Sequence, residues 1–207
     1  ESKLDFDMVF SALNKVRDEI AANMPYKLVY IRNVEADDII GVICDQTQEF
    51  GQNEPVLIIS ADKDFIQLQK YNNIRQYSPM TKKFIQDPNP RKYIFEHTLK
   101  GDSSDGIPNV LSGDNCFVEG IRQSPMTKKK IELYLEHAED LENFMEPEIY
   151  RNYKRNQMLI DLSYIPEEIR TDIINTYDNA KVAPRMKILN YLIKNRCKLL
   201  IECIEDF

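Results

Sequence analysis

The sequence predicts an α/β fold over residues 1–100, with a partial parallel sheet flanked by helices, and an all-α region over residues 101–207. The run Val56–Ile59 is apolar, too short for a helix core and mostly β-branched, which is typical of a buried parallel strand covered on both faces. Residues 37–50 show helical apolar spacing just before it. From residue 124 onward, prolines stand near a series of helix-like starts.

In the first half, we expect an amphipathic helix over 5–23, a strand over 27–31, and a helix over 37–50 that ends at Gly51. A second strand follows over 55–59. This strand–helix–strand order predicts that the two strands pair in parallel through a right-handed crossover.

The next elements are shorter. We expect helical turns over 64–69, strands over 74–77 and 83–85, and a helix over 91–100. Residues 101–120 hold four of the six glycines and show no clear periodicity. The remaining chain is predicted to be helical over 124–137, 147–159, 166–177, 184–194 and 196–205.

Composition excludes several classes of function. The chain has no run of 18 apolar residues, so no membrane span is expected. Its four cysteines lack CxxC spacing, and His97 and His137 are the only histidines, which argues against a zinc site. The net charge of −7 disfavours nonspecific binding to nucleic acid, although residues 151–200 carry ten basic and five acidic residues.

Acidic residues follow the predicted elements in three places. In an open α/β sheet, ligands bind beyond the carboxyl ends of strands, so these acids are expected to converge. Oxygen ligands select Mg²⁺ or Mn²⁺, and two such ions about 4 Å apart suit hydrolysis of a phosphodiester. The candidates are Glu35, Asp37, Asp38, Asp62, Asp64, Asp102 and Asp105.

A simpler interpretation is open for each group alone. Glu35, Asp37 and Asp38 are also typical of helix N-termini, where acids cap free amides and offset the dipole. Asp62 can cap the turn after Ser60. The Asp105–Gly106 pair can be a plain turn. The sequence contains neither a GxxxxGK[ST] phosphate loop nor a GxSxG elbow.

Together, the acidic motifs and their flanks resemble a known family. The stretches are 34–40 (VEADDII), 58–68 (IISADKDFIQL) and 99–108 (LKGDSSDGIP), with further similarity over 150–162. They resemble the structure-specific 5′ nucleases (flap endonucleases), and within them the RNase H branch of the T-even phages. The resemblance covers essentially the whole chain and implies a PIN/5′-nuclease-like fold and a metal-dependent nuclease that removes RNA primers and 5′ flaps in DNA replication.

The resemblance also implies roles for the acids. Glu35, Asp37 and Asp62 would surround a first Mg²⁺ or Mn²⁺ ion. Asp64 and Asp105 would serve a second ion. Two further acids would be outer-shell or water-mediated ligands, namely Asp38 and Asp102.

A duplex-binding element is implied over 101–137, similar to a helix–hairpin–helix. Gly101 and Gly106 would lie in its hairpin region, and Lys128, Lys129 and Lys130 would lie near phosphates. A solvated helix face is the plain alternative for the lysines. The family's Gly-x-Gly-x-Lys pattern is missing, and Gly106 stands where the family has Asn.

The family's first strand, its metal-binding Asp and its helical arch are not found in this chain; Asp5 and Asp7 lie in a predicted helix and do not replace them. We therefore expect a fragment, or one subunit of a split enzyme, that alone binds metal weakly and cleaves little. The implied partners are flap or branched DNA, RNA–DNA hybrid duplex and an N-terminal nuclease subunit in trans. Single-strand-binding protein or a sliding clamp is a further candidate, and the implied location is the cytoplasm of an infected bacterium.

Two other functions stay open on the sequence alone. One is a noncatalytic module in which the helical half binds duplex DNA and the acids are vestigial. The other is a module that binds a replication partner, for which the C-terminal residues 203–207 are a candidate contact. A frayed helix end is the plain interpretation of that tail.

Overall fold

The computed structural model describes residues 5–49 and 52–207, which form two compact units. One unit comprises residues 35–170, and the other combines the described part of 1–34 with 171–207. The boundary that the sequence suggested at residue 100 lies inside the first of these units, and it stays a prediction about functional domains. All seven candidate acids and the candidate DNA-binding residues belong to the unit 35–170.

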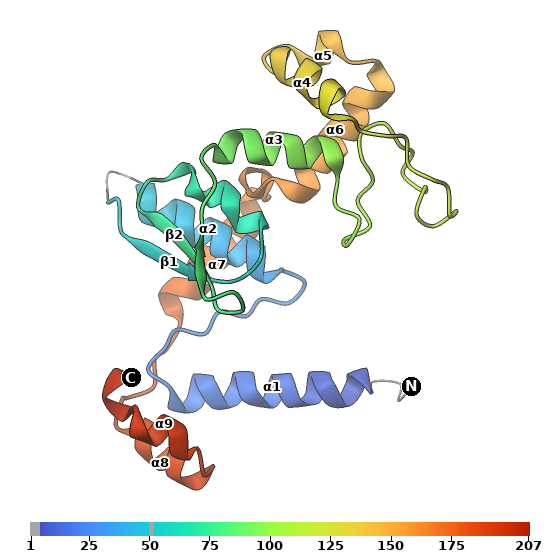
Figure 1. Ribbon diagram of the computed structural model, residues 1–207. Coiled ribbons are helices and arrows are strands. Elements are labelled where there is room, and N and C mark those ends of the chain that lie inside the picture. The colour runs from blue at the N-terminus through green and yellow to red at the C-terminus, as the bar shows by residue number, and fades with distance from the viewer. Residues whose placement is uncertain (1–4, 50–51) are drawn as a thin grey trace. The chain divides into compact units, whose positions relative to one another are not determined.

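The described residues of this unit form one three-stranded sheet (Figure 1). Strand β1 (Val56–Ile59) pairs in parallel with β2 (Ile74–Ser78), and β2 pairs antiparallel with β3 (Lys83–Ile85). These three strands confirm the predicted positions. The mixed fold, with a small sheet, flanking helices and a helical region after it, confirms the predicted class.

The strand expected over 27–31 is wrong. These residues form neither helix nor strand, and they lie in the other compact unit. Tyr30 is exposed there, with the Arg17 guanidinium 4.5 Å from its ring centroid. An apolar run becomes a strand only where a neighbour accepts and donates its backbone hydrogen bonds. The predicted parallel pair therefore forms between β1 and β2 instead.

Strand β1 is covered on one face only, which corrects the expectation of two covered faces. Ile58 is 5% exposed and packs with Phe65 and Leu68, whereas Leu57 is 54% exposed and Ile59 is 68% exposed. The covered face meets helix α2 (Ala36–Gln48) and the 3-10 helix η2 (Asp64–Lys70) through this core. The apolar run therefore looks uniformly buried in the sequence. In the folded chain its residues alternate between covered and exposed positions.

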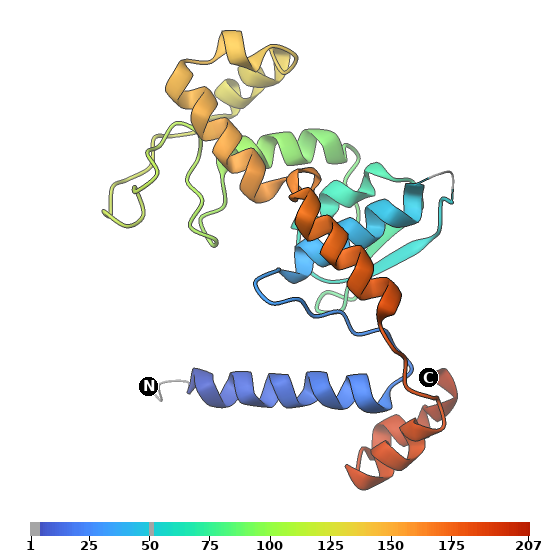
Figure 2. The same ribbon diagram turned by 180° about the vertical axis from the view of Figure 1, so that it is seen from behind.

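Helix α2 begins close to its predicted start, and its predicted end at Phe50 and Gly51 lies outside the described residues. Helix α3 (Pro90–Lys100) follows the sheet and packs against α6 (Pro147–Ile160), as both Figure 1 and Figure 2 show. Between α3 and α4 the chain forms no helix or strand over residues 101–127. The absence of periodicity over 101–120 predicted this for those residues, whereas 124–127 were expected to be helical.

A second core joins the helices around this irregular segment. Its buried residues include Leu99, Val110, Ile131 and Tyr153. The helices are α4 (Lys128–Glu136), α5 (Leu141–Phe144) and α6, followed by the 3-10 helix η3 (Leu162–Tyr164).

Helix α4 begins later than the predicted Ser124. Its N-cap is Thr127, whose hydroxyl accepts a hydrogen bond from the Lys130 amide at 3.4 Å. Ser124 is tied to the irregular segment, because its amide donates to the Ser112 hydroxyl and its carbonyl accepts from Asn109. These bonds draw the chain away from helical geometry at the Ser-Pro start.

The other compact unit is helical. Helix α1 (Phe6–Asn23) meets α8 (Lys187–Lys194). Helix α7 (Glu167–Asn179) contains the boundary between the units, and α9 (Lys198–Glu202) and η4 (Ile204–Asp206) end the chain. Within 5–49 and 52–207, no helix is long and apolar enough to span a membrane.

Strand β1 supplies a matched pair of substitutions. Ile58→Ala should lower the free energy of unfolding by about 2–4 kcal/mol, because it leaves a cavity in a packed core. Ile59→Ala removes the same atoms from an exposed position and should cost less than about 1 kcal/mol. Urea unfolding of both variants measures the difference. Equal losses would contradict the one-sided burial of β1.

Candidate metal centre

The first acidic segment lies at the start of α2. Glu35 is its N-cap residue and Asp37 and Asp38 are in its first turn, yet the Glu35 side chain makes no capping hydrogen bond. Glu35 is exposed, and Asp37 and Asp38 are half-buried. Helix capping therefore does not account for the acid at position 35. The Glu35 carboxylate makes no capping bond and can bind another group.

The second segment is the loop that leaves β1. Here the Ser60 hydroxyl accepts from the Asp62 amide at 3.1 Å, and Asp62 Oδ1 accepts from the Asp64 amide at 3.0 Å. The buried Gln76 of β2 holds this loop from below, donating through Nε2 to the carbonyls of Ser60 and Asp62. Asp62 thus makes the local turn contact that the simpler interpretation expected, and its other oxygen stays unused by that contact.

Three carboxylates from these two segments converge. Asp37, Asp62 and Asp64 each offer an oxygen, and these oxygens all lie within 4.8 Å of one another. Burial and repulsion from Asp62 and Asp64 raise the pKa of Asp37 to about 6. Like charges this close favour a bound cation or a proton.

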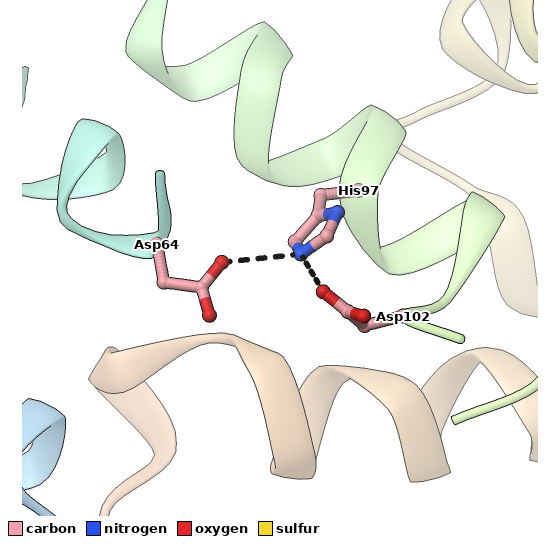
Figure 3. Close-up of side chains that lie close together, drawn as sticks. All are labelled: Asp64, His97 and Asp102. Atoms are coloured by element: carbon pink, nitrogen blue, oxygen red, sulfur yellow. Dashed lines mark ion pairs between the residues drawn. The ribbon is translucent and has the colours of Figure 1, made fainter. Parts of the chain in front are cut away.

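A second group shares Asp64. His97, in the last turn of α3, places Nε2 3.2 Å from Asp64 Oδ1 and 3.6 Å from Asp102 Oδ2 (Figure 3). The ligand atoms of this trio also lie within 4.8 Å of one another. The trio lines a pocket together with the Ser60–Asp64 loop and Tyr93. Burial, then the charge of Asp64, raises the pKa of Tyr93.

Asp102 is held by its own loop. Its Oδ1 accepts from the Ser104 amide at 2.8 Å and from the Ser104 hydroxyl. The hydroxyl bond is the main cause that lowers the pKa of Asp102. Its carbonyl accepts from the Ile107 amide at 2.7 Å, which closes the loop into an isolated bridge. Asp102 Oδ2 is the oxygen that faces His97.

The buried Asn156 of α6 fastens this loop to α3. Its Nδ2 donates to the carbonyls of Thr98 at 2.9 Å and Pro108 at 2.8 Å, one on each side of the acidic loop. Asn152 donates to the carbonyls of Val110 and Ser112 further along. Helix α6 therefore positions Asp102 without contacting it.

Gly101 has a backbone role at the end of α3. Its φ is +66°, and its amide donates to the His97 carbonyl at 2.8 Å. A Cβ at this position would stand 2.4 Å from the Ile107 carbonyl oxygen. Gly106 has a φ of +74° with open space around it. Either glycine thus allows a left-handed backbone that other residues adopt only with strain.

The structure brings together four of the seven candidate acids in the two groups, which are Asp37, Asp62, Asp64 and Asp102. Glu35 and Asp38 stand near enough to contribute to the raised pKa of Asp37. Asp105 is largely exposed. The small part of its carboxyl that is buried, and then repulsion from Asp102, raise its pKa. Asp102, expected as an outer ligand, lies in a tight group, whereas Asp105 lies in neither.

His97 is the site residue that sequence reasoning missed. From the sequence it is a candidate only for a zinc site, which the two histidines and the lack of CxxC spacing argue against. The available signal was its place one turn before the Gly101–Asp102 junction, on the element that leads into an acidic loop. Such a position puts a histidine at the mouth of the acidic cluster.

The donor set fits a hard divalent cation. The clustered carboxylates repel one another, and a divalent ion bound by their oxygens would relieve that repulsion. The buried His97 Nε2 also has no hydrogen-bond partner among the described residues. A divalent cation bound among these oxygens and the His97 nitrogen would give all of these atoms a common partner.

Comparison with known proteins identifies the family. The family model "T4 RNase H, C terminal" matches residues 89–207, and that of the "5′-3′ exonuclease, N-terminal resolvase-like domain" matches residues 8–96. The ribonuclease H of Enterobacteria phage T4 is 37% identical over 100% of this chain and 69% of its own length. The chain belongs to the T4 RNase H family of 5′ nucleases. The resemblance drawn from the acidic motifs is thereby confirmed.

Other known proteins match less of the chain. A 5′-3′ exonuclease of Buchnera aphidicola subsp. Schizaphis graminum is 41% identical over 47% of this chain and 34% of its own length. Among solved structures, the T5 D15 protein co-crystallised with metal ions is 21% identical, with a TM-score of 0.44 over 72% of this chain and 62% of that chain.

The raised pKa of Asp37 gives a signed pH dependence. The folded state holds its proton up to about pH 6, whereas an ordinary Asp loses it near 3.8, so stability falls as pH rises through this window and is flat above it. Asp37→Asn should remove that fall and stabilise the chain at pH 7 by roughly 1 kcal/mol, after allowance for solvent screening.

Urea unfolding at pH 4, 5, 6 and 7 in the absence of divalent ions measures this effect. Glu139→Gln, at an exposed position outside both acidic groups, is the control and should leave the pH profile unchanged. A profile of the Asp37→Asn variant that matches the wild type would show that the carboxylates do not repel one another as their positions imply.

Gly101→Ala tests the junction that carries Asp102. The new Cβ meets the Ile107 and Pro108 backbone at 2.4–2.6 Å in a left-handed conformation, so the free energy of unfolding should fall by about 3 kcal/mol or more. Gly113→Ala, which meets nothing within 4 Å and has no positive φ, should cost less than about 1 kcal/mol. Chemical denaturation compares them, and similar costs would refute the close backbone approach.

Proposed function

We propose that this chain supplies metal ligands to a divalent-cation-dependent 5′ nuclease that hydrolyses phosphodiester bonds at 5′ ends and flaps. The observation that carries the proposal is the convergence of Asp37, Asp62 and Asp64 within 4.8 Å in a member of a nuclease family. Two ions, Mg²⁺ or Mn²⁺, would activate the attacking water and stabilise the leaving oxygen.

The residues divide naturally around Asp64, which belongs to both groups. We assign Asp37 and Asp62 to one ion and Asp102 to the other, with Asp64 between them. Because Asp64 offers an oxygen to both groups, one carboxylate serving both ion positions is consistent with its place between them. Three further acids lie near these groups and would contact water bound to the ions, namely Glu35, Asp38 and Asp105.

The nucleic-acid contact is proposed over 101–137. Lys128, Lys129 and Lys130 are exposed and fill the first turn of α4, where free amides also favour an anion such as a phosphate. Gly101 and Gly106 give the preceding segment its left-handed turns. These features support contacts between the chain and the phosphates of a duplex. Such contacts carry no sequence preference.

The proposed substrates are flap or branched DNA and RNA–DNA hybrid duplex, in keeping with a T4 relative named ribonuclease H. Partners proposed from the same membership are an N-terminal nuclease subunit in trans, and single-strand-binding protein or a sliding clamp. The proposed location is the cytoplasm of a phage-infected bacterium.

Cleavage of a labelled 5′-flap duplex tests the proposal, using the native enzyme with any polypeptide that co-purifies with this chain. Mg²⁺ should support cleavage and EDTA should abolish it. Asp64→Asn should lower the rate by about 100-fold or more, because it removes an oxygen shared by both ion positions and metal contributes several kcal/mol to such reactions. Glu139→Gln, at an exposed position outside the cluster, should cleave like the wild type.

Binding separates catalysis from the rival function. Fluorescence anisotropy in Ca²⁺ should show that Asp64→Asn still binds the flap duplex. If the native enzyme binds the duplex but shows no metal-dependent cleavage, or if Asp64→Asn cleaves normally, the chain is a noncatalytic DNA-binding module and the proposal is wrong.

A further inference from the structure

His97 carries a buried nitrogen that lies between two carboxylates. Among the described residues, its Nε2 is inaccessible to solvent and makes no aligned hydrogen bond, although it lies at ion-pair distance from Asp64 and Asp102. A buried polar atom without an aligned hydrogen bond is uncommon and points to a further partner. Figure 3 marks the two ion pairs with dashed lines and shows the carboxylates on either side of the nitrogen. The nitrogen therefore faces the centre of an acidic pair.

The separations are close to those between neighbouring ligands of one ion. Nε2 lies 3.2 Å from Asp64 Oδ1 and 3.6 Å from Asp102 Oδ2. Ligands about 2.1 Å from a cation, at angles between octahedral and tetrahedral values, are about 3.0–3.5 Å apart, so the first separation fits and the second is slightly longer. Each of the three residues offers a ligand atom that lies within 4.8 Å of the other two. A small movement of Asp102 would therefore let the trio surround a single ion.

The fold orients two of the three ligand atoms, those of His97 and Asp102. Tyr93 stacks on the His97 ring one turn earlier in α3, with ring centroids 5.9 Å apart. The Gly101 amide donates to the His97 carbonyl, which closes the last turn of that helix. In Asp102, Ser104 occupies Oδ1 and leaves Oδ2 toward His97. The ring and the free oxygen are thus fixed toward the same point.

We propose that His97 is a direct nitrogen ligand of the ion held by Asp64 and Asp102. The proposal rests on the metal-dependent function above and adds a mixed nitrogen–oxygen donor set to its second ion position. Imidazole suits first-row transition ions better than Mg²⁺, whose usual ligands are oxygens. His97 should therefore shift the preference of this position toward Mn²⁺.

Pulsed electron paramagnetic resonance of the Mn²⁺-loaded chain tests the bond directly, because a coordinated imidazole gives a ¹⁴N hyperfine coupling. His137 is the only other histidine, and it stacks on Phe144 outside both acidic groups. The coupling should persist in His137→Gln and vanish in His97→Gln. Titration should show Mn²⁺ affinity at least about tenfold lower in His97→Gln, with a smaller loss for Mg²⁺.

A labelled sample makes the test independent of whether His97→Gln folds. In the His137→Gln background, selective ¹⁵N labelling of histidine labels His97 alone. The ¹⁴N coupling should then be replaced by a ¹⁵N coupling. A spectrum unchanged by the label would overturn the proposal.

The remaining outcomes separate this inference from the proposed function. Mn²⁺ bound without any nitrogen coupling overturns the inference and leaves a carboxylate-only nuclease site intact. No Mn²⁺ binding by the native enzyme, with any polypeptide that co-purifies with this chain, overturns both the inference and the proposed metal site. A nitrogen coupling from His97 without cleavage by the native enzyme supports the inference and rejects the nuclease proposal.

Discussion

Repulsion between carboxylates is the constraint around which the unit 35–170 is built. Asp37, Asp62 and Asp64 are brought together from the start of α2 and the loop after β1, and burial followed by their repulsion raises the pKa of Asp37 to about 6. In an unfolded chain these charges would move apart. The hydrophobic core formed by α2, β1 and η2 holds them together, so the free energy of core packing opposes the electrostatic repulsion. A bound cation would relieve that repulsion.

Polar side chains away from the acids maintain that arrangement. Gln76 binds the backbone on both sides of the turn that leads to Asp62, and Asn156 binds the backbone on both sides of the loop that carries Asp102. Both are buried, and both satisfy carbonyls that the irregular backbone would otherwise leave unpaired. Neither touches the carboxylates. The positions of the carboxylates therefore depend on the side-chain amides of Gln76 and Asn156, which donate to main-chain carbonyls of other segments.

Sequence reasoning recovered the features that depend on local patterns. The strand at Val56–Ile59, the helix after Glu35 and the acids at element ends follow from spacing, and their joint presence led to the family. It missed features that depend on which segments meet. His97 reaches Asp64 only once α3 is packed on η2, Ile59 is exposed because no described element covers that face, and residues 27–31 lack a neighbouring strand. None of these contacts leaves a periodic trace in the chain.

The hydrogen bonds from α6 have a consequence for protein engineering. The acidic loop and its clamp are separated by some fifty positions in the chain, yet Asn156 joins Thr98 to Pro108 across the loop. Transplanting residues 101–112 into a related scaffold would move the Asp102 carboxylate and Ser104 but not the Asn156 amide that fastens the loop. A chimera that keeps its activity would need α3, the loop and α6 to be exchanged together as one structural unit.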